Sequence, residues 1–448
     1  MASAADQMAQ SMNLAKFAKA TDLKKRLWFT IGALIVFRLL SYVPLPGIDP
    51  TALTELAQRT SGGVLDFFNT FSGGSLKRAS LIALGVMPYI TASIVVQLAT
   101  SLSPQLAAIK KDGESGRKRL NQYTRYGTVG LTAVQGYFIA LGFQSQGVVV
   151  EPGTLFVVGT IISLIGGTMF LMWLGEQITA RGIGNGVSLI IMAGIVANLP
   201  TTLFNLLEGG RSGSVDPVRL IGIVVAVVLL VLFICFMERA QRRILIQYPK
   251  RQTQRGMQAD RSHLPLKINT AGVIPPIFAS SLLLMPLTIS QFAGQRVAGE
   301  SRWGDFIITL NQYLQHGSPV YMALYGAGIV FFSFFYTAVV FNPEETADNL
   351  KRYGGFIPGI RPGKNTETYF DYVLTRITVI GAAYLTIICL LPEYLVTALQ
   401  IPFYLGGTSL LIVVNVTMDT VTQIQSHLLA HQYGDLIKKA KLKGGRLR

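Results

Sequence analysis

The sequence predicts an all-α polytopic membrane protein, and three observations point to that fold class. Half of the residues are hydrophobic, 14% are charged, and the mean hydropathy is +0.44, whereas about a quarter of the residues in soluble domains are charged. The hydrophobic residues form ten long runs, each close to the roughly 20 residues that a helix needs to cross a bilayer. The lysines and arginines between these runs gather on one side of the predicted membrane.

Ten membrane-spanning helices are predicted from the hydrophobic runs. They cover residues 27–43, 79–100, 123–143, 154–174, 186–204, 218–237, 270–290, 319–341, 372–391 and 403–423. The first is slightly short and contains Arg38, whose charge is costly inside a membrane. We expect its side chain to extend outward to the membrane surface. An even number of spans places both ends of the chain on the same side.

The basic residues orient these spans. Of the 39 lysines and arginines, 29 fall on one side, in segments 1–26, 101–122, 175–185, 238–269, 342–371 and 424–448. Seven fall on the other side. The positive-inside rule assigns the basic side to the cytoplasm, so both termini are predicted to be cytoplasmic. Residues 1–26 lack an apolar core of signal-peptide length, and the first span is expected to serve as an uncleaved insertion signal. The basic loops are expected to face anionic lipid headgroups.

The spans also predict a division into two halves. Five spans precede the external loop 205–217 and five follow it, and an odd number in each half gives the halves opposite orientations, as in an inverted repeat. The predicted parts are listed in chain order: a cytoplasmic N-terminal tail (1–26), an N-terminal half (27–204), an external hinge loop (205–217), a C-terminal half (218–423) with long cytoplasmic loops at 238–269 and 342–371, and a basic cytoplasmic C-terminal tail (424–448).

The sequence predicts neither catalytic residues nor a cofactor nor a metal site. All four histidines lie in predicted loops or the tail, and Cys235 and Cys389 lie singly in apolar runs. The glycine-rich stretch 174–186 fits neither a Walker A loop nor a dinucleotide-binding turn. The protein is therefore expected not to be an enzyme, and a partner would have to supply any energy.

Two rival functions are open to a protein of this class. A secondary solute or ion transporter with an inverted repeat would place a coupling carboxylate near mid-membrane, but the clear acid within the predicted spans is Asp419, near the cytoplasmic end of the tenth. An intramembrane protease would need a Ser–His pair, paired aspartates or a histidine cluster, and the spans contain no histidine. Both rivals are disfavoured. A purified protein that moved a small solute alone would indicate a transporter.

Two segments have unusual local sequence. Residues 64–71 are mainly apolar and lie within the segment 62–74, between glycine pairs. They are too short to span the membrane, so they form either a surface helix on the external side or a movable stopper inside the protein. In the second span, Pro88 is expected to kink the helix. Val86 and Ile90, four residues apart, should share a face, and the polar Gln97 points to a helix–helix seam or a wet interior.

Motifs throughout the chain resemble the SecY family, the central subunit of the bacterial protein-translocation channel. In order, they are Phe71–Gly74, Ala83–Gln97, Glu114–Tyr126, Leu171–Gly186, Asn269–Ser281, Phe341–Leu350, Gly359–Gly363 and Pro402–Val414. The resemblance covers Lys24 to Arg446. It implies a clamshell of two inverted five-helix halves around an hourglass pore. It also implies a channel that passes unfolded secretory polypeptides across the membrane and releases hydrophobic segments sideways into the bilayer through a lateral gate.

The resemblance also implies roles for individual residues. The pore ring would be Val86, Ile90, Ile191, Ile277 and Ile412; family members mostly have isoleucine there, so Val86 departs by one methylene. Such a ring excludes water and ions from a narrow waist yet yields to a passing peptide. The plug would be Val64, Leu65, Asp66, Phe67, Phe68, Asn69, Thr70 and Phe71, which favours the stopper. The gate would open between spans two and three on one half and seven and eight on the other, near Pro88, Gln97 and Asn269.

Partners are implied by the same resemblance. Arg251, Arg255 and Arg361 match loop positions that the family uses to bind the motor ATPase SecA or the ribosome, whose RNA phosphates suit basic loops. The smaller subunits SecE and SecG, secretory and membrane polypeptide clients, and anionic lipids complete the expected partners. The expected location is the bacterial plasma (inner) membrane.

Overall fold

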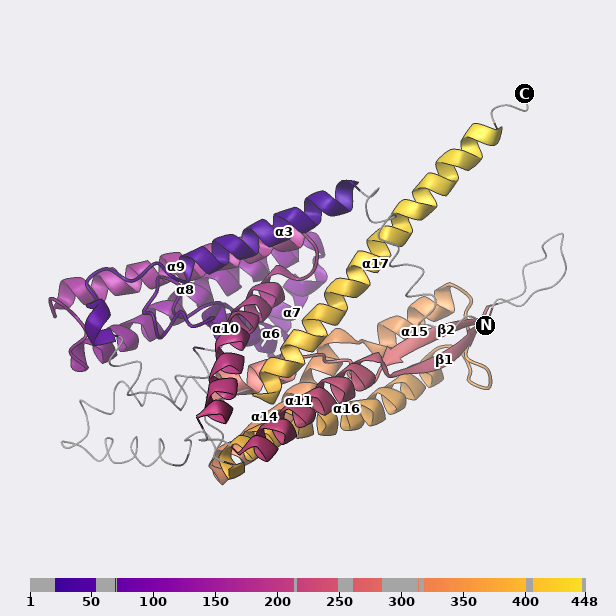
Figure 1. Ribbon diagram of the computed structural model, residues 1–448. Helices are drawn as coiled ribbons and strands as arrows, with labels where there is room; N and C mark the ends of the chain where they lie inside the picture. Colours follow the sequence, from indigo (N-terminus) through magenta and orange to yellow (C-terminus); the bar gives the residue numbers. More distant parts are fainter. Residues whose placement is uncertain are drawn as a thin grey trace.

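The computed structural model describes residues 21–53, 69, 71–212, 216–248, 261–283, 313, 318–399 and 406–444. Long helices make up almost all of the regular structure in this part of the chain, which confirms the predicted fold class. Figure 1 shows two groups of helices, one containing α3, α8 and α9 and the other containing α11, α14 and α16. Helices α10 and α17 contact each other where the two groups meet.

Helices of the first half begin and end as follows: α3 (Thr21–Leu40), α6 (Met87–Leu102), α7 (Pro104–Lys111), α8 (Glu114–Ser145), α9 (Thr154–Arg181) and α10 (Gly186–Arg211). Their starts follow from local sequence. The side chain of Asn185, for example, accepts hydrogen bonds from the N–H groups of Val187 and Ser188 and so caps α10.

Helices of the second half are α11 (Pro217–Arg239), a short apolar helix Ile274–Leu283, α14 (Pro319–Val340), α15 (Pro343–Arg352), α16 (Lys364–Leu399) and α17 (Gly407–Gly444). Three of them start with proline. Proline lacks an N–H group, and this loss is tolerated in the first turn because N–H groups there have no acceptor within the helix. Ser318 and Asn342 cap α14 and α15 with their side-chain oxygens. Each of the ten predicted spans therefore contains a described helix.

Fewer than ten of the described helices are both long enough and apolar enough to be recognised as membrane spans by these two criteria alone. Among the described residues, five are long and apolar enough to cross a membrane, and α6 with α7 would be a sixth, although the pair is bent by 107°. Helices α3, α8 and α17 fail because charged and polar residues dilute their apolar stretches. The ten-helix arrangement thus agrees with the predicted fold although several of its members are weakly hydrophobic.

The start of the second span is not helical, which corrects the predicted helix start at residue 79 and the predicted kink at Pro88. Residues 79–86 form successive turns, with φ values of 42° at Ala79 and 57° at Gly85, and α6 begins only at Met87. Pro88 consequently lies in the first turn of α6 and causes no kink. The chain bends instead after Leu102, where α6 ends and α7 begins.

Several helices extend beyond the predicted spans. The predicted cytoplasmic loop 101–122 is mostly helical, since α7 fills part of it and α8 starts at Glu114. The predicted tail continues α17 as far as Gly444. Hydropathy marks only the membrane-embedded part of a helix, so these polar extensions were not predicted.

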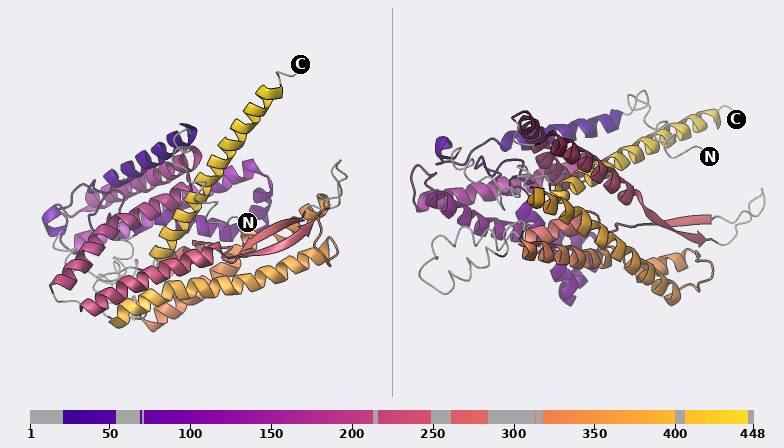
Figure 2. Two further views of the ribbon diagram at one scale, coloured as in Figure 1. Left: turned by 45° about the vertical axis from the view of Figure 1, so that its right-hand side comes forward. Right: turned by 60° about the horizontal axis from the view of Figure 1, so that its bottom comes forward.

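A two-stranded antiparallel sheet lies within the predicted loop 238–269. Strands β1 (Gln241–Gln247) and β2 (Arg261–Lys267) pair with Gln241 opposite Lys267. In both views of Figure 2 the hairpin projects from the same end of the molecule as the C-terminal end of α17. Long basic loops had been predicted here, but not their strands.

The hairpin belongs to a small lobe with its own core, here called the hairpin lobe: β1, β2, α15, residues 353–363 and the start of α16. Ile244, Leu266, Ala347, Ile357 and Phe370 are buried together in it. Gln247 and Phe356 exchange two backbone hydrogen bonds of 2.9 Å, which tie the two long loops to each other. These loops therefore form one folded unit.

The main hydrophobic core is shared by both halves. Buried residues of α3, α6, α9 and α10 belong to the same cluster as those of α11, α14, α16 and α17; examples are Phe37, Ile178, Tyr321 and Ile388. The two halves therefore pack as one body, and any path between them runs through this core.

Candidate functional site

The five predicted ring residues lie together in the main core. Val86, Ile90, Ile191, Ile277 and Ile412 all belong to one cluster, and their exposed fractions range from 1% for Ile412 to 8% for Ile90. Three come from the first half and two from the second. The five positions are therefore buried in one apolar cluster to which both halves contribute, and their side chains offer water no hydrogen-bond partner.

Local structure at the start of α6 orients two of these side chains. The carbonyl of Val86 accepts the N–H of Ile90 at 3.1 Å, which closes the first helical turn. Residues four apart on a helix lie on one face. Val86 and Ile90 therefore share a face as predicted, although Val86 itself is the residue that precedes the helix.

Of the predicted plug, only Asn69 and Phe71 lie among the described residues; Val64–Phe68 and Thr70 lie outside them. Phe71 is 5% exposed and packs in the same cluster as the ring. Asn69 holds the following turn, because its Oδ1 accepts the N–H of Lys77 at 3.0 Å and its carbonyl accepts the N–H of Gly74 at 2.8 Å. The end of the predicted plug is thus fixed beside the ring.

Helix α10 accommodates this segment by means of a glycine. A Cβ atom on Gly194 would lie 2.7 Å from the carbonyl oxygen of Phe71, closer than van der Waals contact allows. Gly194 follows the ring residue Ile191 by three positions, about one turn. The segment after the predicted plug therefore packs backbone to backbone against the helix that holds a ring residue.

Two arginines converge on the carbonyl of Gly73. Arg38 Nη1 and Arg78 Nη2 each donate a hydrogen bond of 2.7 Å to this oxygen, and both guanidinium groups stack over the ring of Tyr42 at 4.9 and 4.5 Å. Burial, followed by the nearby positive charge of Arg38, lowers the pKa of Arg78 from its ordinary value. We call Arg38, Tyr42, Gly73 and Arg78 the Gly73 clamp.

The clamp corrects the expectation for Arg38. The side chain was expected to extend outward to the membrane surface, but it turns toward Gly73 and also donates to the hydroxyl of Tyr42 at 3.0 Å. An arginine within a span finds a protein partner where one is available. That partner lies 35 residues away in the sequence, so the local pattern gave no sign of it.

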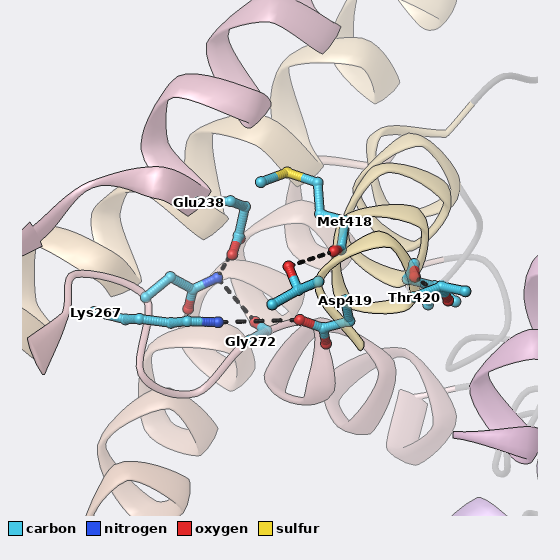
Figure 3. A network of polar contacts seen from close by, with 9 residues as sticks. Glu238, Lys267, Gly272, Met418, Asp419 and Thr420 are labelled. Carbon is cyan, nitrogen blue, oxygen red and sulfur yellow. Dashed lines mark hydrogen bonds and ion pairs between the residues drawn. The ribbon is translucent and has the colours of Figure 1, made fainter. Parts of the chain in front are cut away.

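Two of the predicted gate residues, Gln97 and Asn269, have separate hydrogen-bond partners. Pro88 is buried in the first turn of α6, and Gln97, on the same helix, donates to the hydroxyl of Ser93 at 3.2 Å. Asn269 is 4% exposed and donates to Glu238 Oε1 at 2.6 Å and to the carbonyl of Gly272 at 3.2 Å. Figure 3 shows this network, in which Lys267 also lies 4.0 Å from Asp419.

Among the predicted docking residues, Arg361 is described and exposed, whereas Arg251 and Arg255 lie outside the described residues. Arg361 lies in a turn between Gly359 and Gly363, whose φ values are 84° and 106°. The hydroxyl of Thr366 donates to the Arg361 carbonyl at 3.0 Å and fixes the turn on the start of α16. The hairpin lobe thus presents Arg361 on a supported loop.

The glycine-rich stretch 174–186 joins the halves. The N–H of Gly184, at a φ of 87°, donates to Gln423 Oε1 of α17 at 2.8 Å, and the N–H of Ile183 donates to Thr30 Oγ1 of α3 at 3.1 Å. This segment was predicted to lie on the cytoplasmic side, without a nucleotide-binding motif. Its contacts link α3 with α17.

One buried acid was missed. Glu393 is 3% exposed on α16, beyond residue 391 where the ninth span was predicted to end. The candidate span in the structure continues to Leu395. The statement that Asp419 is the clear acid within the spans was therefore wrong, because the hydrophobic run was cut short at Pro392.

Comparison with known proteins decides the family. Residues 80–421 match the family model described as SecY, which is well over half of the chain. The chain belongs to the SecY family. It is 53% identical over 428 residues to the protein translocase subunit SecY of Escherichia coli (strain K12), a match that covers 94% of this chain and 96% of the relative.

Solved structures of the SecY fold resemble this one at low sequence identity. One is a SecY protein whose plug domain stabilises the closed state of the translocation channel and maintains a membrane seal; its TM-score is 0.63 at 19% identity, and the match covers 90% of this chain and 92% of that chain. Another is Sec61 in the canine ribosome–channel complex, with a TM-score of 0.61 at 16% identity and the same coverage. These likenesses support the fold.

Membership of the SecY family establishes the general function. The chain is a subunit of protein translocase and forms a protein-conducting channel; it is not an enzyme by itself. Its long apolar helices, among them α11 with largely exposed side chains, make it a multi-pass membrane protein. The transporter and protease rivals are therefore excluded.

Proposed function

We propose that Val86, Ile90, Ile191, Ile277 and Ile412 form the waist through which unfolded polypeptides pass. The observation that supports this role best is the burial of all five, from both halves, in a single cluster. Branched aliphatic side chains exclude ions by dewetting a constriction, and they offer no directional bonds that would favour one peptide sequence over another.

The proposed plug, residues 64–71, seals the waist together with the ring. Phe71 supports this, because it packs in the ring's cluster, and so does the anchoring of the next residues against Gly194. The proposed lateral gate lies between spans two and three and spans seven and eight, with Pro88, Gln97 and Asn269 beside it. Through it, a sufficiently hydrophobic segment would leave for the bilayer.

Further assignments belong to the same proposal. Residues 27–204 and 218–423 are the inverted halves, 205–217 is the external hinge, and both termini face the cytoplasm of a bacterial inner membrane. SecE and SecG are the proposed companion subunits. SecA or a ribosome would dock on Arg251, Arg255 and Arg361; the exposure of Arg361 and the solved ribosome–channel neighbour support this.

The role of the proposed ring is tested by removing two of its side chains. Replacing Ile90 and Ile277 with glycine removes two side chains from the waist and should raise the resting ion conductance of the channel in planar bilayers. Ile178→Gly serves as the control, since Ile178 is fully buried in the same cluster but is not a ring residue. Cysteines at positions 90 and 277 should also crosslink to an arrested export substrate. Unchanged conductance together with no crosslink would disprove the proposal.

A further inference from the structure

A cavity lined by polar and apolar side chains opens beside the face of α17 that carries Ile412. It has a volume of about 280 Å³ and is lined by the start of α10, the end of α11, residues 267–274, the end of α14 and α17. Both halves of the molecule therefore contribute to it. A second cavity of about 210 Å³ shares Glu238, Lys267, Asn415 and Asp419 with the first. At roughly 30 Å³ per water molecule, the larger one has room for a side chain rather than a single ion.

The cavity contains a buried carboxylate without a cation in contact. Glu238 is 8% exposed; its carboxylate accepts a hydrogen bond from the neutral amide of Asn269, and Tyr384, Lys267 and Asp419 lie near enough to affect it electrostatically. Among the described residues, no lysine or arginine forms an ion pair with Glu238. Burying a carboxylate beside a neutral partner leaves its charge incompletely compensated. The site therefore favours an incoming positive charge.

Asn415 gives an independent sign of a ligand. Its side chain is 8% exposed and lines both cavities, and its amide nitrogen lies close to Gly272. No described residue makes a hydrogen bond with this side chain. Buried amides in proteins normally have hydrogen-bond partners. An amide that faces a cavity without one is positioned to bond to whatever enters.

Asp419 completes the polar wall and is already weakly paired. Its Oδ1 lies 4.0 Å from Lys267 Nζ, and the side chains are 62% and 61% exposed. Exposed ion pairs of this length contribute little, so another cation can replace Lys267. The described residues contain no group of three His, Cys, Asp or Glu residues that would hold a metal ion, which disfavours a metal as the occupant.

The position of the cavity indicates which cation enters. Asn415, Val416 and Asp419 follow Ile412 by three, four and seven residues, so they lie on the ring face of α17, up to about 10 Å from the ring along the helix axis. A segment that targets a polypeptide for export has its positive charges directly before its apolar stretch. When the apolar stretch lies at the ring or gate, those charges come within reach of this cavity.

We propose that Glu238, Asn415 and Asp419 form a binding site for the lysine or arginine side chains that precede the apolar segment of a client polypeptide. This site rests on the proposed ring and gate, and it adds a selectivity for clients with a basic flank. Lys267 occupies the mouth of the site when no client is present, and the client's cation displaces it from Asp419.

The test compares two clients that differ only in the flank of their apolar segment, one with two lysines and one with two glutamines. Export is measured with the full translocase, carrying Asp419→Asn, Glu238→Gln or Asn415→Val in the channel subunit. The preference for the lysine client should fall about two- to fivefold in Asp419→Asn, the range expected for one partly exposed charge pair, and it should also fall in the other two variants. Asp371→Asn, an exposed carboxylate on α16 outside the cavity, should leave the preference unchanged.

A charge reversal at Asp419 tests whether the client preference can be changed in the opposite direction. Asp419→Lys should favour a client with two glutamates before the apolar segment. The glutamine client reports on the channel itself: its export should persist in every variant, whereas a failure of the proposed ring would show in the conductance and crosslinking experiments. An unchanged lysine preference, or an equal loss for both clients, would overturn the site.

Discussion

At the scale of single residues, the Gly73 clamp is the least expected feature of the structure. Two guanidinium groups share one carbonyl oxygen and one aromatic ring. Like charges in contact repel, so the arrangement persists only because the Gly73 carbonyl and the Tyr42 ring face offer negative potential to both. The clamp holds the residues that directly follow the proposed plug.

Loss of one arginine should loosen that hold. Arg78→Gln removes a charge-assisted hydrogen bond to Gly73, worth about 1.5 kcal/mol, and such a change corresponds to about a tenfold shift of a closed–open equilibrium. Resting ion conductance in planar bilayers should therefore rise by up to about tenfold. Arg211→Gln, an exposed charge at the end of α10, is the control for the loss of charge. Equal conductance in the two variants would show that the clamp does not stabilise the closed state.

At the residue level, the burial of apolar positions could be predicted from the sequence, whereas polar partners that lie far away in the chain could not. All five residues of the proposed ring are buried in one cluster, and their role as a pore waist stays a prediction. The partners of Arg38 and Gly184 were not predicted, because they lie 35 and 239 residues away in the sequence. The predicted kink at Pro88 was wrong, because the sequence does not reveal that turns replace helix before Met87.

At the scale of secondary-structure elements, the glycine-rich segment 182–186 connects α3 and α17. Gln423→Leu would leave the buried N–H of Gly184 without a partner, at a cost of about 1–3 kcal/mol. The melting temperature of the purified protein should fall by about 1–3 °C. Thr422→Val is the matched control, since the exposed Thr422 hydroxyl bonds only to the Met418 carbonyl of its own helix. A similar decrease in both variants would contradict a specific link between the halves.

The hairpin lobe makes a separate prediction for partner docking. Arg361→Glu should slow motor-driven export severalfold while the lobe stays folded, because Arg361 is exposed and only its backbone supports the turn. Arg352→Glu, which reverses another exposed charge at the end of α15, is the control for charge reversal. The measurement is the export rate together with the melting temperature. Normal export by the Arg361 variant would remove this residue from the docking site.

Element boundaries were predictable only within the membrane. A hydropathy pattern locates both ends of α11 to within two residues and the start of α9 at Thr154, because these ends coincide with the ends of the apolar runs. The polar extension of α16 and the pairing of β1 with β2 depend on contacts within the hairpin lobe. Charge and length predicted a projecting segment there, but not its architecture.

At the scale of the whole molecule, the distribution of basic residues predicts orientation. A single cysteine at Asp348, on α15 of the hairpin lobe, should react with a membrane-impermeant thiol reagent only from the cytoplasmic side. A cysteine at Glu151, between α8 and α9, should react only from outside. The background needs Cys235 and Cys389 replaced by alanine. Labelling with the opposite sidedness would reverse the proposed topology.

Helix α17 runs unbroken for 38 residues, about 57 Å at 1.5 Å per residue. Its N-terminal part holds Ile412 of the proposed ring, and its C-terminal end projects away from the two groups of helices (Figure 1). A rigid rod of this kind transmits torque. A large particle that bound to the C-terminal end of α17 would tilt or rotate the whole helix. It would therefore move one side of the proposed waist without contacting it.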